Sequence, residues 1–255
     1  MNESLQPTEE LTDLPLSEDE HKVLFEGVPY DELPESFTIS ETVLESCLDV
    51  WNTFSTSDFS PMYYSARERA RAFYLKRLGE GGEEQDNARQ HLAHLDREEK
   101  YETEYGLQMY LVDNKIIKGR VHRGKRKSIL LRNKLDQIPD EQSVVNIHNH
   151  PNDLTFSLQD IITVIADVEN VPHRCLYLVV TSAHLYLIFP TINTVRVDLE
   201  VLRKQLEEAN EDMWEVAGLE GEARAEAQLK YVSAACKKSY LGFYYSQKDK
   251  VLRRS

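Results

Sequence analysis

The chain has no long hydrophobic run: nowhere does it approach the ~20 consecutive apolar residues that a membrane-spanning helix needs. Its amino end also lacks the basic and apolar pattern of a secretion signal. Cysteine is scarce, and the wide spacing of Cys47, Cys175 and Cys236 offers neither a disulfide framework nor the paired spacing of a zinc ribbon. These absences predict a cytoplasmic protein that lives in a reducing environment and does not enter a membrane.

Positive charge is almost missing from the amino end. Residues 1–50 hold fourteen Asp and Glu against Lys22 alone, so this segment carries −13 of the total formal charge of −14. Prolines recur before residue 39 and interrupt any helix there, and the high charge favours an extended or disordered segment. We therefore predict that residues 1–38 form an acidic arm, which is either a solubilising tail or a docking or autoinhibitory segment.

Internal repeats and long heptad runs are also absent. With 255 residues and 41% hydrophobic content, the chain can bury a full core, which indicates one domain with helical additions. Apolar and β-branched runs predict strands over 106–112, 115–121, 143–147, 175–181, 184–189 and 191–197. Helical spacing predicts helices over 39–51, 62–78, 84–100, 157–169, 198–217 and 222–240. We divide the chain into the arm, a helical region at 39–100, a central domain at 101–197 and a C-terminal helical extension at 198–255. The expected class is α/β, a three-layer sandwich around a mixed β-sheet.

The stretch most informative about chemistry runs from His148 to Asp160 and reads HNHPNDLTFSLQD. The apolar run before it predicts a buried strand, and strand alternation sends His148 and His150 to the same face. Ser157 stands where a helix N-cap belongs, and Asp160 falls in the first turn of the helix that follows. Two imidazoles and one carboxylate can therefore converge on one ion.

This set of three side chains fits zinc, which prefers four ligands and leaves the fourth position to water in catalytic sites. Bound zinc lowers the pKa of that water from ~15.7 to ~7, and a neighbouring base is still needed to carry the proton. Each half of the motif also has a structural explanation, because His-x-His is common and Ser-x-x-Asp is an ordinary helix-capping pattern. The combination at one strand exit and helix entry favours a metal site.

The pattern His-x-His-Pro, followed by Ser-x-x-Asp-Ile, resembles the JAMM (MPN-type) metalloenzymes, most closely the bacterial branch that includes RadC-like proteins. The resemblance covers about residues 102–197, and the spacing from His150 to Ser157 is one residue shorter than is usual in that family. It implies a cytidine-deaminase-like sandwich with zinc bound by His148, His150 and Asp160. It also implies that Ser157 helps to stabilise the oxyanion and that an upstream glutamate is the general acid and base. Glu104, two residues before Gly106, fits that glutamate best, and Glu102 is the alternative.

Three functions follow as expectations. The first is a zinc metalloprotease that cuts a peptide or isopeptide bond, with a protein substrate that includes ubiquitin-like modifiers. The second, from the RadC-like resemblance, is a nucleic-acid-associated protein whose basic loop, Arg120 to Lys127, contacts DNA. The third is a metal-free scaffold that keeps the fold without the chemistry.

Overall fold

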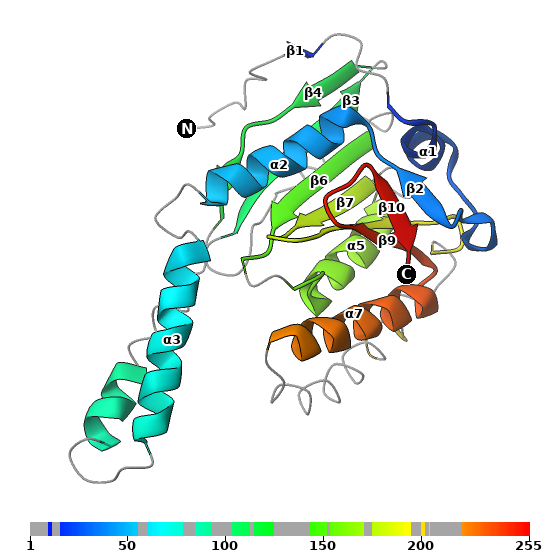
Figure 1. The fold of residues 1–255 in the computed structure, drawn as a ribbon. Helices are drawn as coiled ribbons and strands as arrows, with labels where there is room; N and C mark the ends of the chain where they lie inside the picture. Colours follow the sequence, from blue (N-terminus) through cyan, green and yellow to red (C-terminus); the bar gives the residue numbers. More distant parts are fainter. Residues whose placement is uncertain are drawn as a thin grey trace.

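The computed structural model describes residues 10–11, 16–55, 61–78, 85–92, 104–112, 115–124, 143–151, 154–170, 175–194, 200–201, 204 and 221–255. Ten strands in these ranges form a single sheet, ordered β1-β4-β3-β6-β7-β8-β9-β10-β2, with β5 paired to β3. Of the described strand pairs, β6 and β7 are parallel and the others are antiparallel. The predicted α/β class with a mixed sheet is confirmed (Figure 1).

The strands are β1 (Glu10–Leu11), β2 (Ser36–Thr38), β3 (Tyr105–Val112), β4 (Lys115–Lys118), β5 (His122–Arg123), β6 (Ser143–Asn149), β7 (Cys175–Val180), β8 (Leu185–Pro190), β9 (Leu241–Ser246) and β10 (Val251–Arg254). The α-helices with described bounds are α1 (Glu18–His21), α2 (Glu41–Ser55), α3 (Pro61–Arg77), α5 (Leu158–Asn170) and α7 (Gly221–Lys238). A π-helical turn (Lys22–Glu26) and a 3-10 turn (Tyr30–Glu32) follow α1. Residues 85–92 are also helical.

Helices pack on both faces of the sheet because the central strands are apolar on both faces. In β7, Leu176 and Leu178 belong to one buried cluster, while Tyr177 and Val179 belong to the other, as strand alternation requires. The first cluster includes the buried side of α2, and the second includes those of α5 and α7. Figure 1 shows α2 on one side of the sheet and α5 with α7 on the other. The sheet is therefore the middle of three layers.

The predicted extended arm is wrong for residues 16–38. Five apolar side chains of this range are at most 5% exposed and belong to the cluster beneath α2: Val23, Leu24, Val28, Leu33 and Phe37. Each such burial contributes about 1.5–3 kcal/mol to the free energy of folding. Together these contributions outweigh the repulsion among the acidic side chains of the segment. β2 adds an edge strand beside β10. The rest of the predicted arm lies outside the described residues apart from Glu10–Leu11, which pair with β4.

The C-terminal region is also corrected, because it is not helical throughout. α7 is present, but residues 241–254 form β9 and β10, which extend the central sheet beyond β8. The aromatic run from Phe243 to Tyr245 lies within β9 and packs in the sheet. The strand expected at 191–197 is not formed over its described part, 191–194, where the chain makes a turn. No helix in the described part of the chain has the length and apolarity needed to cross a bilayer.

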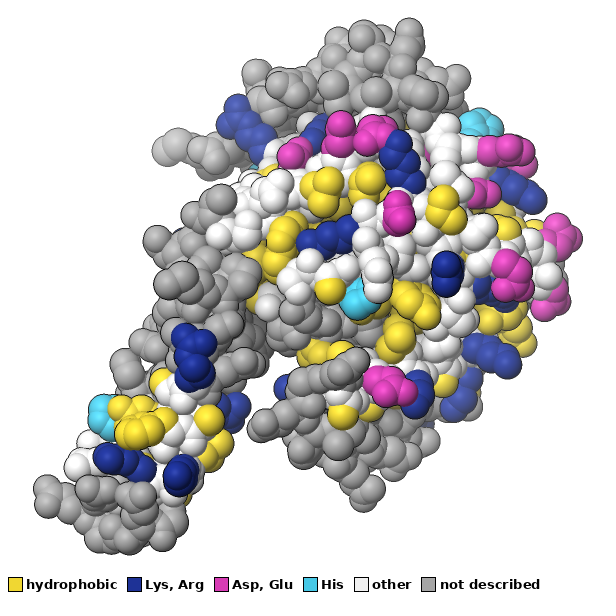
Figure 2. All heavy atoms as spheres, in the orientation of Figure 1, with side chains coloured by type: hydrophobic (Ala, Val, Ile, Leu, Met, Phe, Trp, Pro, Cys, Tyr) yellow, Lys and Arg dark blue, Asp and Glu magenta, His cyan; other side chains and the backbone are white. Residues whose placement is uncertain are grey.

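α3 extends away from the sheet, with residues 85–92 running beside it (Figure 1). The two helices contact through Tyr74 and His91, whose rings stack with centroids 4.6 Å apart. Basic and apolar side chains share the surface of this projection (Figure 2), and Phe73 is 51% exposed.

One buried carboxylate secures the amino-terminal segment. Glu20 is fully buried and accepts hydrogen bonds from the backbone N–H groups of Ser17 (2.9 Å) and Ser40 (3.0 Å). We expect Glu20→Ala to lower the free energy of unfolding by about 2–4 kcal/mol, because it leaves buried donors without an acceptor. Urea denaturation measures this, with Glu18→Ala as the exposed control on the same helix. A loss equal to that of the control would contradict the assigned role.

The same carboxylate makes stability depend on pH. Burial raises the pKa of Glu20, and the hydrogen bonds from Ser40 and Ser17 only partly offset this. A raised folded-state pKa gives a contribution that is complete below the unfolded-state pKa and declines as pH rises through the folded-state value. Relative to Glu20→Gln, the wild-type protein should therefore lose stability as pH rises from about 4.

Candidate metal centre

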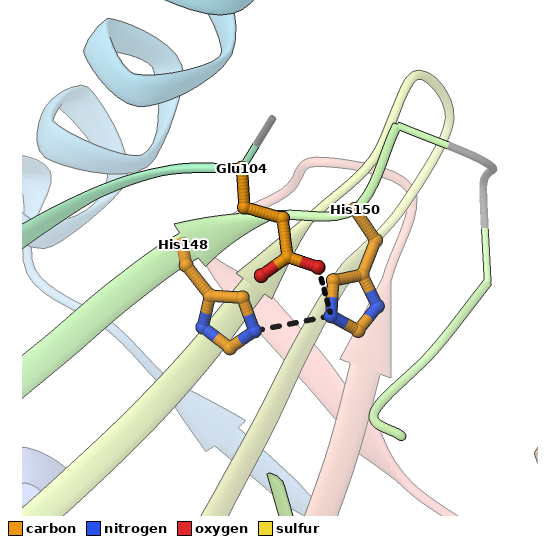
Figure 3. Close-up of side chains that lie close together, drawn as sticks. All are labelled: Glu104, His148 and His150. Atoms are coloured by element: carbon orange, nitrogen blue, oxygen red, sulfur yellow. Dashed lines mark hydrogen bonds and ion pairs between the residues drawn. The ribbon is translucent and has the colours of Figure 1, made fainter. Parts of the chain in front are cut away.

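The two histidines leave the sheet on the same face. β6 is buried along its whole length between β3 and β7. Its pairing continues one residue past Asn149, because the backbone N–H of His150 donates to the carbonyl of Val180 at 3.0 Å. Strand alternation therefore persists through His150, and both imidazoles point into the same space (Figure 3).

Asp160 is held in place by the start of α5. The hydroxyl and the backbone N–H of Ser157 each donate to Asp160 Oδ2 at 2.6 Å. In return, the backbone N–H of Asp160 donates to Ser157 Oγ at 3.2 Å. This reciprocal cap orients the carboxylate toward the end of β6, so the shortened connection from His150 to Ser157 still places Asp160 beside the histidines.

The three predicted ligands lie close together, and the two carboxylate oxygens of Asp160 each face a different histidine. The two Nε2 atoms of His148 and His150 are 3.1 Å apart. Asp160 Oδ1 lies 3.5 Å from His148 Nε2, and Asp160 Oδ2 lies 3.5 Å from His150 Nε2. Ligand atoms of a tetrahedral zinc site with bonds of about 2.0–2.1 Å are about 3.3–3.4 Å apart. The donor types and their closeness therefore suit a divalent metal ion, and imidazole with carboxylate is a donor set that zinc accepts.

Glu104 approaches the same space from the residue before β3 (Figure 3). Its side chain is 12% exposed, and Oε1 lies 3.9 Å from His150 Nε2. Glu104, His148 and His150 each offer a ligand atom, and these atoms lie within 4.8 Å of one another. The separation from His150 is longer than a tetrahedral edge, which favours Glu104 as a neighbour of the ion over Glu104 as a close ligand. Glu102, the alternative base, lies outside the described residues.

The tautomer of His150 is set by the loop that follows it. His150 Nδ1 lies 3.0 Å from the carbonyl oxygen of Leu154 and 2.9 Å from that of Thr155. A carbonyl can only accept, so Nδ1 carries a hydrogen, and when the ring is neutral, as a metal ligand must be, its Nε2 lone pair faces the cluster. Metal-binding histidines are commonly oriented in this way. Gln228 of α7 braces the loop, donating to the carbonyl of Phe156 at 3.1 Å.

Charge in the cluster also suits a cation. Burial lowers the pKa of His150, but hydrogen bonding to Asp160 and the charges of Asp160 and Glu104 raise it more, to about 9. Burial raises the pKa of Asp160, yet His148 and His150 hold it well below its usual value. In the metal-free protein, protonated imidazole thus balances the buried carboxylates. A divalent ion would supply that positive charge directly.

Sequence reasoning missed Asn149, the residue between the two histidines. It is fully buried, and its Oδ1 accepts the backbone N–H of Tyr105 at 2.6 Å. This bond fixes the chain directly after Glu104 and so sets where the Glu104 carboxylate lies. An asparagine at the end of a strand that is expected to be buried was the available signal, but the partner strand could not be read from the sequence.

The structure thus brings His148, His150, Asp160 and Glu104 together, with Ser157 hydrogen-bonded to Asp160. Of the predicted basic loop, residues 120–124 are described, and β5 within them pairs with β3. Lys125 to Lys127 lie outside the described residues, and the nucleic-acid role stays a prediction. No family model, curated protein or solved structure matches the chain.

Proposed function

We propose that the protein is a zinc-dependent hydrolase of amide bonds, acting on a peptide or isopeptide bond of a protein substrate. The observation that carries this proposal is the cluster of His148, His150 and Asp160, in which each imidazole lies 3.5 Å from one carboxylate oxygen, with Glu104 beside it. The resemblance of the HNHP and Ser-x-x-Asp motifs to JAMM metalloenzymes supports the same reading.

The roles follow from the positions of the side chains. The two Nε2 atoms and the Asp160 carboxylate would hold the ion, with the His150 ring fixed by its Nδ1 contacts. Zinc bound there would polarise the scissile carbonyl and lower the pKa of a water molecule. Glu104 accepts a proton as the water oxygen bonds to the carbonyl carbon. It then returns that proton to the departing nitrogen as the C–N bond breaks, which leaves an amine and a carboxylic acid that loses its proton to solvent.

Ser157 has two possible contributions. Its hydroxyl donates to Asp160 in the structure, so it orients that carboxylate. Donation to the developing oxyanion, which the resemblance implies, would require the hydroxyl to turn away from Asp160. Ser157→Ala tests whether the residue supports the metal site, the reaction, or both.

Cleavage of peptide and isopeptide libraries tests the proposed function. We expect zinc-loaded wild-type protein to cut members of at least one library and to stop when a chelator removes the metal. Glu18→Gln, a change on the exposed side of α1, should leave cleavage unchanged. If zinc-loaded protein cut no member of either library, a protein that binds the ion without cleaving amide bonds would become the better account.

A further inference from the structure

A row of polar side chains runs along the sheet from the metal centre. Opposite residues of an antiparallel pair point to the same face, and β3 and β6 pair Gly106 with His148, Gln108 with Asn146, and Tyr110 with Val144. Gln108, Asn146 and Tyr110 therefore share the face that carries the histidines. Gly106 leaves the position across from His148 without a side chain, between Glu104 and Gln108.

Hydrogen bonds fix the orientation of the side-chain amides in this row. The Tyr110 hydroxyl donates to Gln108 Oε1 at 2.8 Å, and Gln108 Nε2 donates to Asn146 Oδ1 at 2.8 Å. Each bond fixes which end of the next amide is oxygen and which is nitrogen. At the end of the row, Asn146 presents its Nδ2 donor on the side away from Gln108.

That donor is left without an acceptor. Asn146 is 4% exposed, and its Nδ2 is a buried nitrogen with no hydrogen-bond partner among the described residues. A buried N–H group without an acceptor is costly, and such groups in folded proteins call for an explanation. An oxygen atom of a bound molecule would satisfy it, and Asn146 lies two residues from His148 on the same face.

We propose that Asn146, oriented by Gln108 and Tyr110, forms a substrate subsite that donates to a backbone carbonyl of an extended peptide. This inference rests on the proposed amide hydrolase and names how its substrate is held. Two residues of strand span about 6.6 Å, which is also the repeat of carbonyls on one side of an extended chain. A peptide aligned with β6, with its scissile carbonyl at the histidines, thus presents a second carbonyl at Asn146.

Two hydroxamates test the subsite without turnover. Acetohydroxamate can reach only the metal, whereas N-acetyl-trialanine hydroxamate also carries backbone carbonyls toward Asn146. We expect the zinc-loaded full-length protein to bind the longer probe more tightly, as measured by calorimetry. Asn146→Ala should weaken the longer probe by about 3–10-fold, the value of one neutral hydrogen bond, and change acetohydroxamate by less than twofold.

Two further variants distinguish the loss of a substrate contact from a disturbance of the fold. Asn146→Asp keeps the shape but replaces the donor by an acceptor, so it should weaken the longer probe by about 10-fold or more. Tyr110→Phe, at a half-buried position, should give a smaller loss because it only loosens the row. Zinc content and melting temperature of each variant establish that the fold is intact.

The outcomes separate the two proposals. If acetohydroxamate binds but Asn146→Ala and Asn146→Asp leave the longer probe unaffected, the subsite is wrong and the hydrolase stands. Equal weakening of both probes would show that Asn146 supports the metal centre and would also overturn the subsite. If neither probe binds zinc-loaded protein, the hydrolase and the subsite fall together.

Discussion

Glu104→Gln is expected to lower kcat by about 10²–10⁴-fold, the usual contribution of a general acid and base. Gln has nearly the same shape, but its amide cannot take a proton from the attacking water. Its oxygen can still face the cluster, so the variant should keep one zinc per chain and a KM close to that of the wild-type protein. The loss should therefore fall on kcat.

Steady-state kinetics on the best library substrate, together with zinc analysis, measure this split. Glu104→Asp is the matched variant, because it keeps a carboxylate but withdraws it by one methylene, and should retain part of the activity. A Glu104→Gln protein that keeps more than about a tenth of the wild-type kcat would exclude Glu104 as the proton carrier. Loss of zinc from the same variant would instead make Glu104 a ligand.

Removal of His150 should have the largest effect on metal binding. His150→Ala deletes one of the two nitrogen donors. It leaves Asp160 with His148 alone and removes the imidazole that lies 3.9 Å from Glu104. Changes to groups that merely support a ligand typically cost 10–100-fold in metal affinity, so loss of the ligand itself should exceed about 100-fold. Activity should vanish with the metal.

Thermal denaturation with and without added zinc shows the effect independently of activity. A ligand at 100 times its Kd stabilises the folded protein by about 2.7 kcal/mol, so zinc should raise the Tm of the wild-type protein clearly. His150→Ala should abolish this rise at the same zinc concentration. His91→Ala, which alters an exposed histidine on the α3 projection, should preserve it. A zinc-dependent Tm rise that survives in His150→Ala would place the ion elsewhere.

Elements with a clear local pattern were predictable from the sequence. β6 follows from its apolar, β-branched run, and α5 from its apolar spacing after Ser157. With these two elements predicted, the convergence of His148, His150 and Asp160 could be predicted as well. This was possible because strand alternation and helix capping depend only on local sequence.

Features set by contacts distant in sequence were not predictable in this way. Residues 1–38 are acidic, and the burial of their few apolar side chains depends on contacts distant in sequence. Phe37, for example, packs against Phe189 and Tyr244. The strand β9 was not predicted because its aromatic residues become part of the sheet only through pairing with β8, which is distant in sequence. The hydrogen bonds of Asn149 and Asn146 are made with β3, and no local pattern specifies the register of β3 against β6.

The central claim is that His148, His150 and Asp160 bind one zinc ion. X-ray absorption at the zinc edge, on protein whose metal content is known, tests it most directly. We predict one zinc per chain, with two imidazole nitrogens and oxygen ligands at about 2.0–2.2 Å and no sulfur. Zinc at less than a few tenths per chain after loading, or a spectrum without imidazole, would contradict the account.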